Sequence, residues 1–267
     1  MGLTNGGWSF TPSKVQVPKQ ETGSQADSLE GRALAAGLRR HDMAEYMEKE
    51  KKLITKIVYY GPALSGKTTN LMRLHDILSG QGCGDLLFFE TKGDRTLFFD
   101  LLPAVVRVGN GFTIKTKMFT VPGQVAHDAT RKSVLARADA VVFVADSQNT
   151  QALNNFESFE NLEKNIQRVG LDFKALPLIV QFNKRDLKDI ISQSDVQDLW
   201  GPTGLPVSFA SALQGRGVRE TFEMVLRLTY QKLNAMYGLQ ARHDITEQEF
   251  MKILPQKTKG GFLYETR

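Results

Sequence analysis

Gly61-Pro62-Ala63-Leu64-Ser65-Gly66-Lys67-Thr68 is the stretch that decides the fold, because it matches the G-x-x-x-x-G-K-[S/T] pattern of a phosphate-binding loop. A β-branched and aromatic run over 53–60 precedes it, and apolar residues at helical spacing follow it over 69–78. In a strand–loop–helix unit, backbone N–H groups and the helix N-terminus can hold a phosphate. The stretch therefore predicts a nucleotide site that runs from Gly61 to Thr69. Lys67 would reach the β- and γ-phosphates, and the Thr68 hydroxyl would ligate Mg²⁺.

Composition narrows the class of protein. The 267 residues include 34 Lys and Arg against 29 Asp and Glu, a net charge of +5, and 41% hydrophobic content supports an ordinary core. The basic excess forms no long run, so we expect no nucleic-acid binding. No apolar stretch approaches the roughly 20 residues that span a bilayer, and no signal-peptide pattern opens the chain, so we expect no membrane insertion. Cys83 is the only cysteine, which excludes an intrachain disulfide and favours the cytoplasm.

Strand-like and helix-like segments alternate through the middle of the chain. The predicted strands are 53–60, 113–120, 140–146, 177–183 and 206–209, and the predicted helices are 67–79, 129–137, 151–168 and 216–236. This alternation predicts an α/β fold of the P-loop NTPase type, with a mostly parallel central sheet flanked by helices. Ligands of such sheets bind beyond the carboxyl ends of the strands, where the motifs of this chain fall.

The regions outside this core differ from it in composition. Residues 1–30 are rich in Gly, Ser, Thr, Gln and Pro and predict a disordered tail. Residues 31–51 are rich in helix formers and predict a helical extension, packed on the core or free to bind a partner. The core domain is expected over 52–237. In the extension over 238–267, Thr246 and Glu249 form a candidate capping box for a short helix.

A second motif, Asn183-Lys184-Arg185-Asp186, follows the strand-like run at 178–182 and matches the N-K-x-D motif that recognises guanine. The Asp186 carboxylate can accept hydrogen bonds from guanine N1–H and the exocyclic amine, for which adenine has no matching pair of donors. Asn183 would tie this loop to the phosphate-binding loop, and the aliphatic stem of Lys184 would lie along the base. Ser211-Ala212-Leu213 stands where the Ala212 N–H would donate to guanine O6.

Two further segments suit the γ-phosphate end of the site. In Thr120-Val121-Pro122-Gly123-Gln124, the Gly123 N–H could face the γ-phosphate and Gln124 could orient the attacking water. Thr120 stands where such motifs usually carry Asp, so the grip on Mg²⁺ must differ. In Asp94-Arg95-Thr96-Leu97-Phe98-Phe99-Asp100, Thr96 is a candidate Mg²⁺ ligand. Arg95 is either a cation that stabilises the transition state or a surface residue paired with Asp94.

Together these segments resemble the MglA family of bacterial small Ras-like GTPases, which set cell polarity and drive gliding motility. The resemblance covers nearly all of 52–236, and its most specific pieces are D-R-T-L-F-F-D at 94–100 and T-V-P-G-Q at 120–124. It implies a Ras-like domain that cycles between GTP and GDP with Mg²⁺, in which Arg95 is an intrinsic arginine finger and Gln124 the catalytic glutamine. It also implies a roadblock-domain regulator similar to MglB, and a cytoplasmic protein brought to the cell poles by partners.

The chain departs from that family in its two extensions and at Ala63, where the family commonly has glycine. A Cβ at this position can crowd Gln124 and Arg95, which suggests slow intrinsic hydrolysis. An alternative function therefore stays open: a GTP-gated adaptor with little hydrolysis, acting through its extensions. The sequence agrees less well with a P-loop metabolic kinase. It has no Arg-rich lid segment between the motifs, and a kinase would leave the N-K-x-D motif unexplained.

Overall fold

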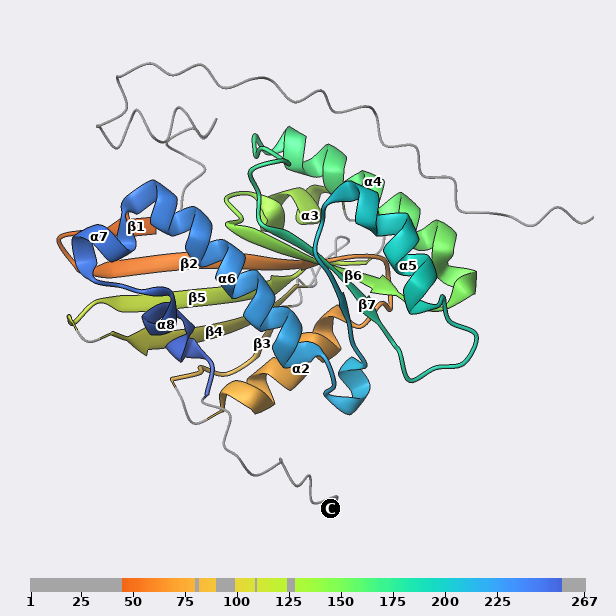
Figure 1. The fold of residues 1–267 in the computed structure, drawn as a ribbon, viewed down its shortest axis with the longest axis horizontal. Coiled ribbons are helices and arrows are strands. Elements are labelled where there is room, and N and C mark those ends of the chain that lie inside the picture. The colour runs from red at the N-terminus through yellow and green to blue at the C-terminus, as the bar shows by residue number, and fades with distance from the viewer. Residues whose placement is uncertain (1–44, 80–81, 90–98, 109, 124–127, 256–267) are drawn as a thin grey trace, which may run out of the picture.

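A mixed sheet forms the middle layer of the molecule in the computed structural model, which describes residues 45–79, 82–89, 99–108, 110–123 and 128–255 (Figure 1). The described strands are Glu45–Met47 (β1), Lys52–Tyr60 (β2), Leu87–Phe89 (β3), Phe99–Arg107 (β4), Thr113–Thr120 (β5), Ala140–Asp146 (β6), Leu178–Asn183 (β7) and Val207–Phe209 (β8). Their order is β3-β4-β5-β2-β6-β7-β8, and β1 pairs with β2. The five strands from β5 to β8 run parallel, and β3, β4 and β1 pair antiparallel. The predicted α/β fold with a mostly parallel sheet is confirmed.

Helices cover both faces of this sheet (Figure 1). The described helices are Lys67–Leu78 (α2), Asp128–Leu135 (α3), Ala152–Arg168 (α4), Gln193–Trp200 (α5), Val218–Tyr237 (α6), Leu239–His243 (α7) and Glu247–Phe250 (α8). One hydrophobic cluster joins the sheet to α2, α6, α7 and α8, and the other joins it to α3, α4 and α5. Alternate residues of β2 point to each cluster, as both faces of a central parallel strand are buried. No helix in the described part of the chain combines the length and apolarity that crossing a membrane needs.

The helix predicted over 31–51 is wrong where the structure describes it, at 45–51. Glu45–Met47 is a strand, and a turn over 48–51 folds it back antiparallel on β2. The Lys51 N–H donates to the Glu48 carbonyl at 3.1 Å within this turn. Ladder hydrogen bonds and burial of Tyr46 outweigh a weak helical preference, since propensity amounts to a few tenths of a kcal/mol per residue. The rest of the predicted helix and the predicted tail over 1–30 lie outside the described residues.

Aromatic side chains from three distant segments meet beside β1. The Tyr46 ring stacks on Tyr237 at a centroid distance of 4.7 Å and lies 6.1 Å from Phe112. The Tyr46 hydroxyl also makes a hydrogen bond with Nε2 of His243, a ring that lies 5.3 Å from Phe112. We call these four residues the end cluster. It joins β1, the β4–β5 turn, the end of α6 and α7, at the end of β2 opposite the phosphate-binding loop.

The C-terminal segment over 239–254 packs as part of the core, although we expected it to belong to an extension outside the core domain. Five of its apolar side chains are at most 6% exposed and belong to the α2–α6 cluster: Leu239, Ile245, Phe250, Ile253 and Leu254. The hydroxyl of Thr246 accepts the Glu249 N–H at 3.2 Å and caps α8. Residues 256–267 lie outside the described residues.

Candidate nucleotide-binding site

The phosphate-binding loop turns sharply between β2 and α2, and two glycines make the turn possible. Gly61 has φ 144° and Gly66 has φ 96°, both in the region that side chains disfavour. A Cβ on Gly61 would lie 2.2 Å from the Val144 carbonyl oxygen, and one on Gly66 would lie 2.3 Å from Nδ2 of Asn183. The loop therefore passes close to β6 and to the end of β7, and no larger residue fits either place.

Lys67 opens α2 with its side chain folded over the loop. Its Nζ donates to the carbonyl oxygens of Gly61 at 3.0 Å and Pro62 at 2.6 Å, and the residue is 7% exposed. Beside it lies a hollow of about 330 Å³ lined by Leu64, Gly66, Lys67, Thr68, Thr69, Thr120, Val121, Pro122 and Gly123. The predicted phosphate-binding residues and the segment that begins at Thr120 thus share one hollow, with an ammonium group at its wall.

Asn183 connects three loops at the carboxyl ends of the strands. Its Nδ2 donates to the Ser65 carbonyl at 2.8 Å, and its Oδ1 accepts the Ala212 N–H at 2.9 Å. The side chain is 2% exposed, so both hydrogen bonds are shielded from water. The predicted tie between the N-K-x-D loop and the phosphate-binding loop is therefore present in the geometry.

The geometry differs from the expectation at Ala212. We expected the Ala212 N–H to donate to guanine O6, but here that N–H donates to Asn183. Close by, the Ser211 hydroxyl donates to Oδ1 of Asp186 at 2.5 Å. A base in this site would have to share the Ala212 N–H with Asn183 or displace it. The Ser211 hydroxyl already orients the Asp186 carboxylate. Such a fixed orientation suits a carboxylate that has to accept hydrogen bonds from two donors of a guanine base.

Several residues that the motifs did not indicate hold these loops in place. Arg73 on α2 donates to the carbonyl oxygens of Ala212 at 3.3 Å and Leu213 at 2.8 Å. Asp146 at the end of β6 pairs with Nζ of Lys184 at 2.6 Å and is 4% exposed. Asp146 follows a continuous apolar run at the edge of the sheet where ligands bind, and that position was a signal for its involvement.

Three predicted site residues, Arg95, Thr96 and Gln124, lie outside the described residues. Thr68 stands at the start of α2 and lines the hollow, as does Thr120 at the end of β5. Gly123 lies directly on the phosphate-binding loop, since a Cβ on it would come within 2.2 Å of Cα of Ala63. The segment that carries Gln124 therefore starts in contact with the loop.

The donor set around the hollow fits a Mg²⁺ ion that arrives with a nucleotide. Its described lining supplies threonine hydroxyls and no carboxylate. Mg²⁺ in nucleotide sites is held largely by phosphate oxygens and water, with few protein ligands. Across the described ranges, no group of three or more His, Cys, Asp and Glu side chains is arranged to hold a metal. The protein would thus bind the ion mainly through the nucleotide.

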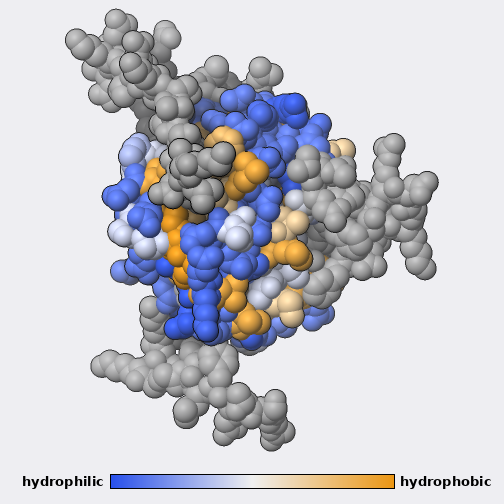
Figure 2. All heavy atoms as spheres, turned by 90° about the vertical axis from the view of Figure 1, so that its right-hand side faces the viewer, coloured by the Kyte–Doolittle hydropathy of each residue, from blue (hydrophilic) through white to orange (hydrophobic). Residues whose placement is uncertain are grey.

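Hydrophobic side chains are exposed on loops at this edge of the sheet. Leu64, Leu187 and Leu213, which follow β2, β7 and β8, are 87%, 40% and 68% exposed. Figure 2 views the molecule from the side toward which β2 points in Figure 1 and shows orange areas among blue ones. A mixed surface of this kind suits contact with a base or with a protein partner.

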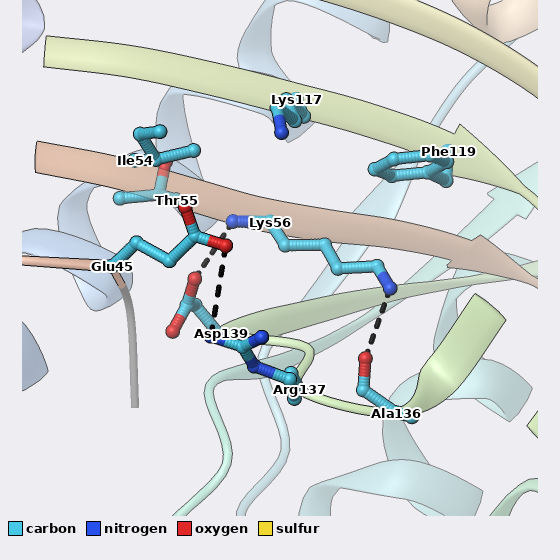
Figure 3. A pocket seen from close by; sticks show the side chains of 9 residues that line it. All are labelled: Glu45, Ile54, Thr55, Lys56, Lys117, Phe119, Ala136, Arg137 and Asp139. Atoms are coloured by element: carbon cyan, nitrogen blue, oxygen red, sulfur yellow. Dashed lines mark hydrogen bonds and ion pairs between the residues drawn. The ribbon is translucent and has the colours of Figure 1, made fainter. Parts of the chain in front are cut away.

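A second hollow of about 160 Å³ lies over the first half of β2, on the α3 side of the sheet (Figure 3). Oδ2 of Asp139 accepts the Lys56 N–H at 2.7 Å, and the Lys56 ammonium donates to the Ala136 carbonyl at 2.9 Å. Burial raises the pKa of the Asp139 carboxyl to about 7 and lowers the pKa of the Lys56 ammonium to about 8. Arg137 pairs with Glu45 of β1 at the rim, 3.6 Å away. This hollow contains no residue predicted for the nucleotide site.

A glycine-bounded loop between a parallel strand and a helix, tied to a second loop by a buried asparagine, defines a P-loop nucleotide-binding protein of the α/β class.

Comparison with known proteins identifies the family within this class. The chain belongs to the Ras family, whose profile matches residues 56–231. The chain is 40% identical to Mutual gliding-motility protein MglA of Myxococcus xanthus over 183 residues, which are 68% of this chain and 94% of that protein. It is 30% identical to ADP-ribosylation factor-like protein 4A of Homo sapiens over 173 residues, 62% of this chain and 79% of that protein. The resemblance to MglA-like small Ras-like GTPases is thereby confirmed.

Proposed function

We propose that the chain is a GTP-binding switch that hydrolyses GTP to GDP with Mg²⁺ and regulates cell polarity or motility in a bacterium. The observation that carries the nucleotide part is the 2.8 Å hydrogen bond from Asn183 to Ser65, which brings the guanine-type loop against the phosphate-binding loop. The motility part rests on the name of the 40% identical relative from Myxococcus xanthus.

In this proposal the loop from Gly61 to Thr69 holds the phosphates, and Asp186, Lys184, Ser211 and Ala212 hold the base. Lys67 would exchange its hydrogen bonds to loop carbonyls for hydrogen bonds to phosphate oxygens, which share the negative charge of the phosphate groups. Asp186 supplies specificity, because an analogue without matching donors would not replace the water that its half-buried carboxylate loses on binding. The N–H of Gly123 would meet the γ-phosphate.

For hydrolysis, Gln124 would orient the attacking water, and Lys67 and Arg95 would stabilise charge on the transferred phosphoryl group. Mg²⁺, held by Thr68 and Thr96 together with the nucleotide, supplies Lewis-acid charge stabilisation when bound. Hydrolysis would release the γ-phosphate contacts of Gly123 and Thr96 and so change the surface that partners meet. We further propose a cytoplasmic location, a roadblock-domain regulator similar to MglB, and placement at the cell poles through partners.

Ala63 supports one alternative, a GTP-gated adaptor with little intrinsic hydrolysis. This residue lies against Gly123, immediately before the position of Gln124. Its methyl group could keep water or Gln124 from the geometry that in-line attack requires, since displacements of about 1 Å can lower rates about 10²-fold. The nucleotide would then control binding of a partner without frequent turnover.

The experiment is single-turnover hydrolysis by the full chain loaded with GTP and Mg²⁺, with and without a roadblock-domain protein. Arg95→Ala is the test variant, and Arg242→Ala, an exposed arginine on α7, is the matched control. The switch predicts GTP affinity retained and turnover lowered by about 10³-fold or more in Arg95→Ala only. Equal turnover in the wild type and both variants, all of them slow, would favour the adaptor. Absence of guanine-nucleotide binding by the wild type would reject both.

A further inference from the structure

Arg131 is the largest side chain that is fully buried in the described part of the chain, at 0% exposure on α3. Its Nε donates to the Pro122 carbonyl at 2.9 Å, one terminal nitrogen donates to the Gly123 carbonyl, and the other donates to Oδ1 of Asn161 at 2.8 Å. The guanidinium also lies over the Tyr60 ring, 5.4 Å from its centroid. A buried charge is costly unless its donors are satisfied, so this arrangement fixes both carbonyl groups firmly.

The bond to Pro122 also sets the direction of the Gly123 N–H. The Pro122 carbonyl and the Gly123 N–H belong to the same planar peptide, and in a trans peptide they point in opposite directions. Since Arg131 holds the carbonyl on the α3 side, the N–H must point away from α3. The phosphate-binding loop lies next to Gly123, because a Cβ there would come 2.5 Å from the Ala63 nitrogen. Pro122 and Gly123 line the phosphate hollow itself.

Polar groups of α4 and β2 hold Arg131 in turn. Oδ1 of Asn161 also accepts the Tyr60 hydroxyl at 2.5 Å and Nδ2 of Asn165 at 3.1 Å. Asn165 donates to Oδ1 of Asp128 at 2.7 Å, and this hydrogen bond holds the pKa of the Asp128 carboxyl below its usual value. Figure 1 shows α3 beside α4 on this face of the sheet. The network therefore links the first residue of α3 to the peptide before Gly123.

We propose that Arg131 is a positioning residue for the γ-phosphate: it fixes the Pro122–Gly123 peptide so that the Gly123 N–H faces the phosphate hollow. This inference rests on the proposed GTP-dependent function. It assigns to Arg131 the discrimination between GTP and GDP, because a free N–H at this place contacts only the nucleotide that carries the third phosphate. A merely structural arginine would affect both nucleotides alike.

The test measures the affinity of the full chain for GDP and for a slowly hydrolysed GTP analogue, GTPγS, in Mg²⁺. Arg131→Met keeps most of the apolar volume and removes all the donors. We expect GDP affinity within about twofold of the wild type and GTPγS affinity lowered about tenfold, since one aligned N–H to a charged oxygen is worth roughly that factor. Arg242→Met, at an exposed arginine on α7, is the matched control and should leave the ratio unchanged.

Tyr60→Phe keeps the test decisive if Arg131→Met does not fold. This change keeps the ring under the guanidinium and removes the hydroxyl that supports Asn161, so we expect the GTPγS-to-GDP ratio to fall about threefold. An unchanged ratio in Tyr60→Phe and in any folded Arg131→Met would overturn the inference, and so would an equal fall in Arg242→Met. A wild type that binds neither nucleotide would instead overturn the proposed function on which the inference rests.

Discussion

Asp139→Asn should make the protein more stable above neutral pH and leave it almost unchanged in acid. The Asp139 carboxyl is 2% exposed, and burial raises its pKa from the model-compound 3.8 to about 7 (Figure 3). Between these pH values the folded state binds a proton that the unfolded state releases, so the free energy of unfolding decreases as pH rises. The shift of about 3 pKa units corresponds to about 4 kcal/mol at about 1.4 kcal/mol per unit.

The asparagine retains the contact that Asp139 makes when protonated. Its amide oxygen can accept the Lys56 N–H, as Oδ2 now does at 2.7 Å, and its NH₂ group takes the place of the second oxygen. Because the amide cannot ionise, the variant avoids the unfavourable charge above pH 7. The difference in unfolding free energy between variant and wild type should therefore increase from near zero at pH 4 toward about 4 kcal/mol at pH 8.

Urea denaturation at several pH values, in a constant excess of GDP, measures this difference. Asp198→Asn is the matched control, because Asp198 is exposed on α5 and should show no such trend. A constant difference between Asp139→Asn and the wild type from pH 4 to pH 8 would refute the reasoning. So would an m-value that changes with the substitution, since it would mean that the native or denatured ensemble had changed.

Three other predictions concern the base, the γ-phosphate end and the C-terminal segment. Asp186→Asn should weaken GTP binding and favour xanthine nucleotides in competition assays, whereas Asp189→Asn, on the same loop, should not; unchanged GTP affinity in Asp186→Asn would reject the base-recognition role. Ala63→Gly should speed single-turnover hydrolysis if the methyl group crowds the catalytic glutamine, and an unchanged rate would contradict that explanation. Phe250→Ala should lower the unfolding free energy by about 3–5 kcal/mol, because the ring is 1% exposed and packs 5.6 Å from Tyr230. A loss below about 1 kcal/mol in denaturant titrations, similar to that of exposed Leu153→Ala, would show that the segment is not part of the cooperative core.

The parts of the site that the sequence predicted are those encoded by short, local patterns. The phosphate-binding loop is such a pattern, because its glycines and Lys67 lie within eight consecutive residues. Asn183 ends a strand whose burial is evident from its apolar residues. Parallel pairing then brings the ends of β2, β6 and β7 to one edge. The relative positions of these loops could therefore be predicted without any knowledge of tertiary contacts.

The elements that the sequence did not predict depend on distant partners. β1 exists because Tyr46 finds Tyr237 and His243, which lie nearly two hundred positions away. β4 contains Pro103, which weakens a strand pattern, and β4 is held as a strand by its pairing with β5 from Leu101 to Arg107. In α5 the buried Val196 and Trp200 lie four residues apart, too few apolar positions for a clear helical period, although Ser192 caps it through Asp195.

Arg131 shows why side-chain roles are harder to predict than folds. In the sequence it is one of many basic residues, and on an amphipathic helix an arginine is expected to face water. Its burial follows from three acceptors supplied by Pro122, Gly123 and Asn161, which no local pattern places together. One feature of the sequence could have suggested this role: Arg131 stands in the first described helix after Gly123, close in the chain to the γ-phosphate segment.

The end cluster also limits when the protein can complete its folding during synthesis. Tyr46 contacts His243, which lies 197 positions later in the chain, so β1 cannot reach its final packing until α7 has left the ribosome. At roughly 5–20 residues per second, the nascent strand would wait roughly 10–40 s for its partner. During that time the Tyr46 ring, which Tyr237 and His243 later contact, is accessible to chaperones and to other nascent chains. Completion of the end cluster therefore follows synthesis of α7, and release of a shorter chain would leave the Tyr46 ring without these partners.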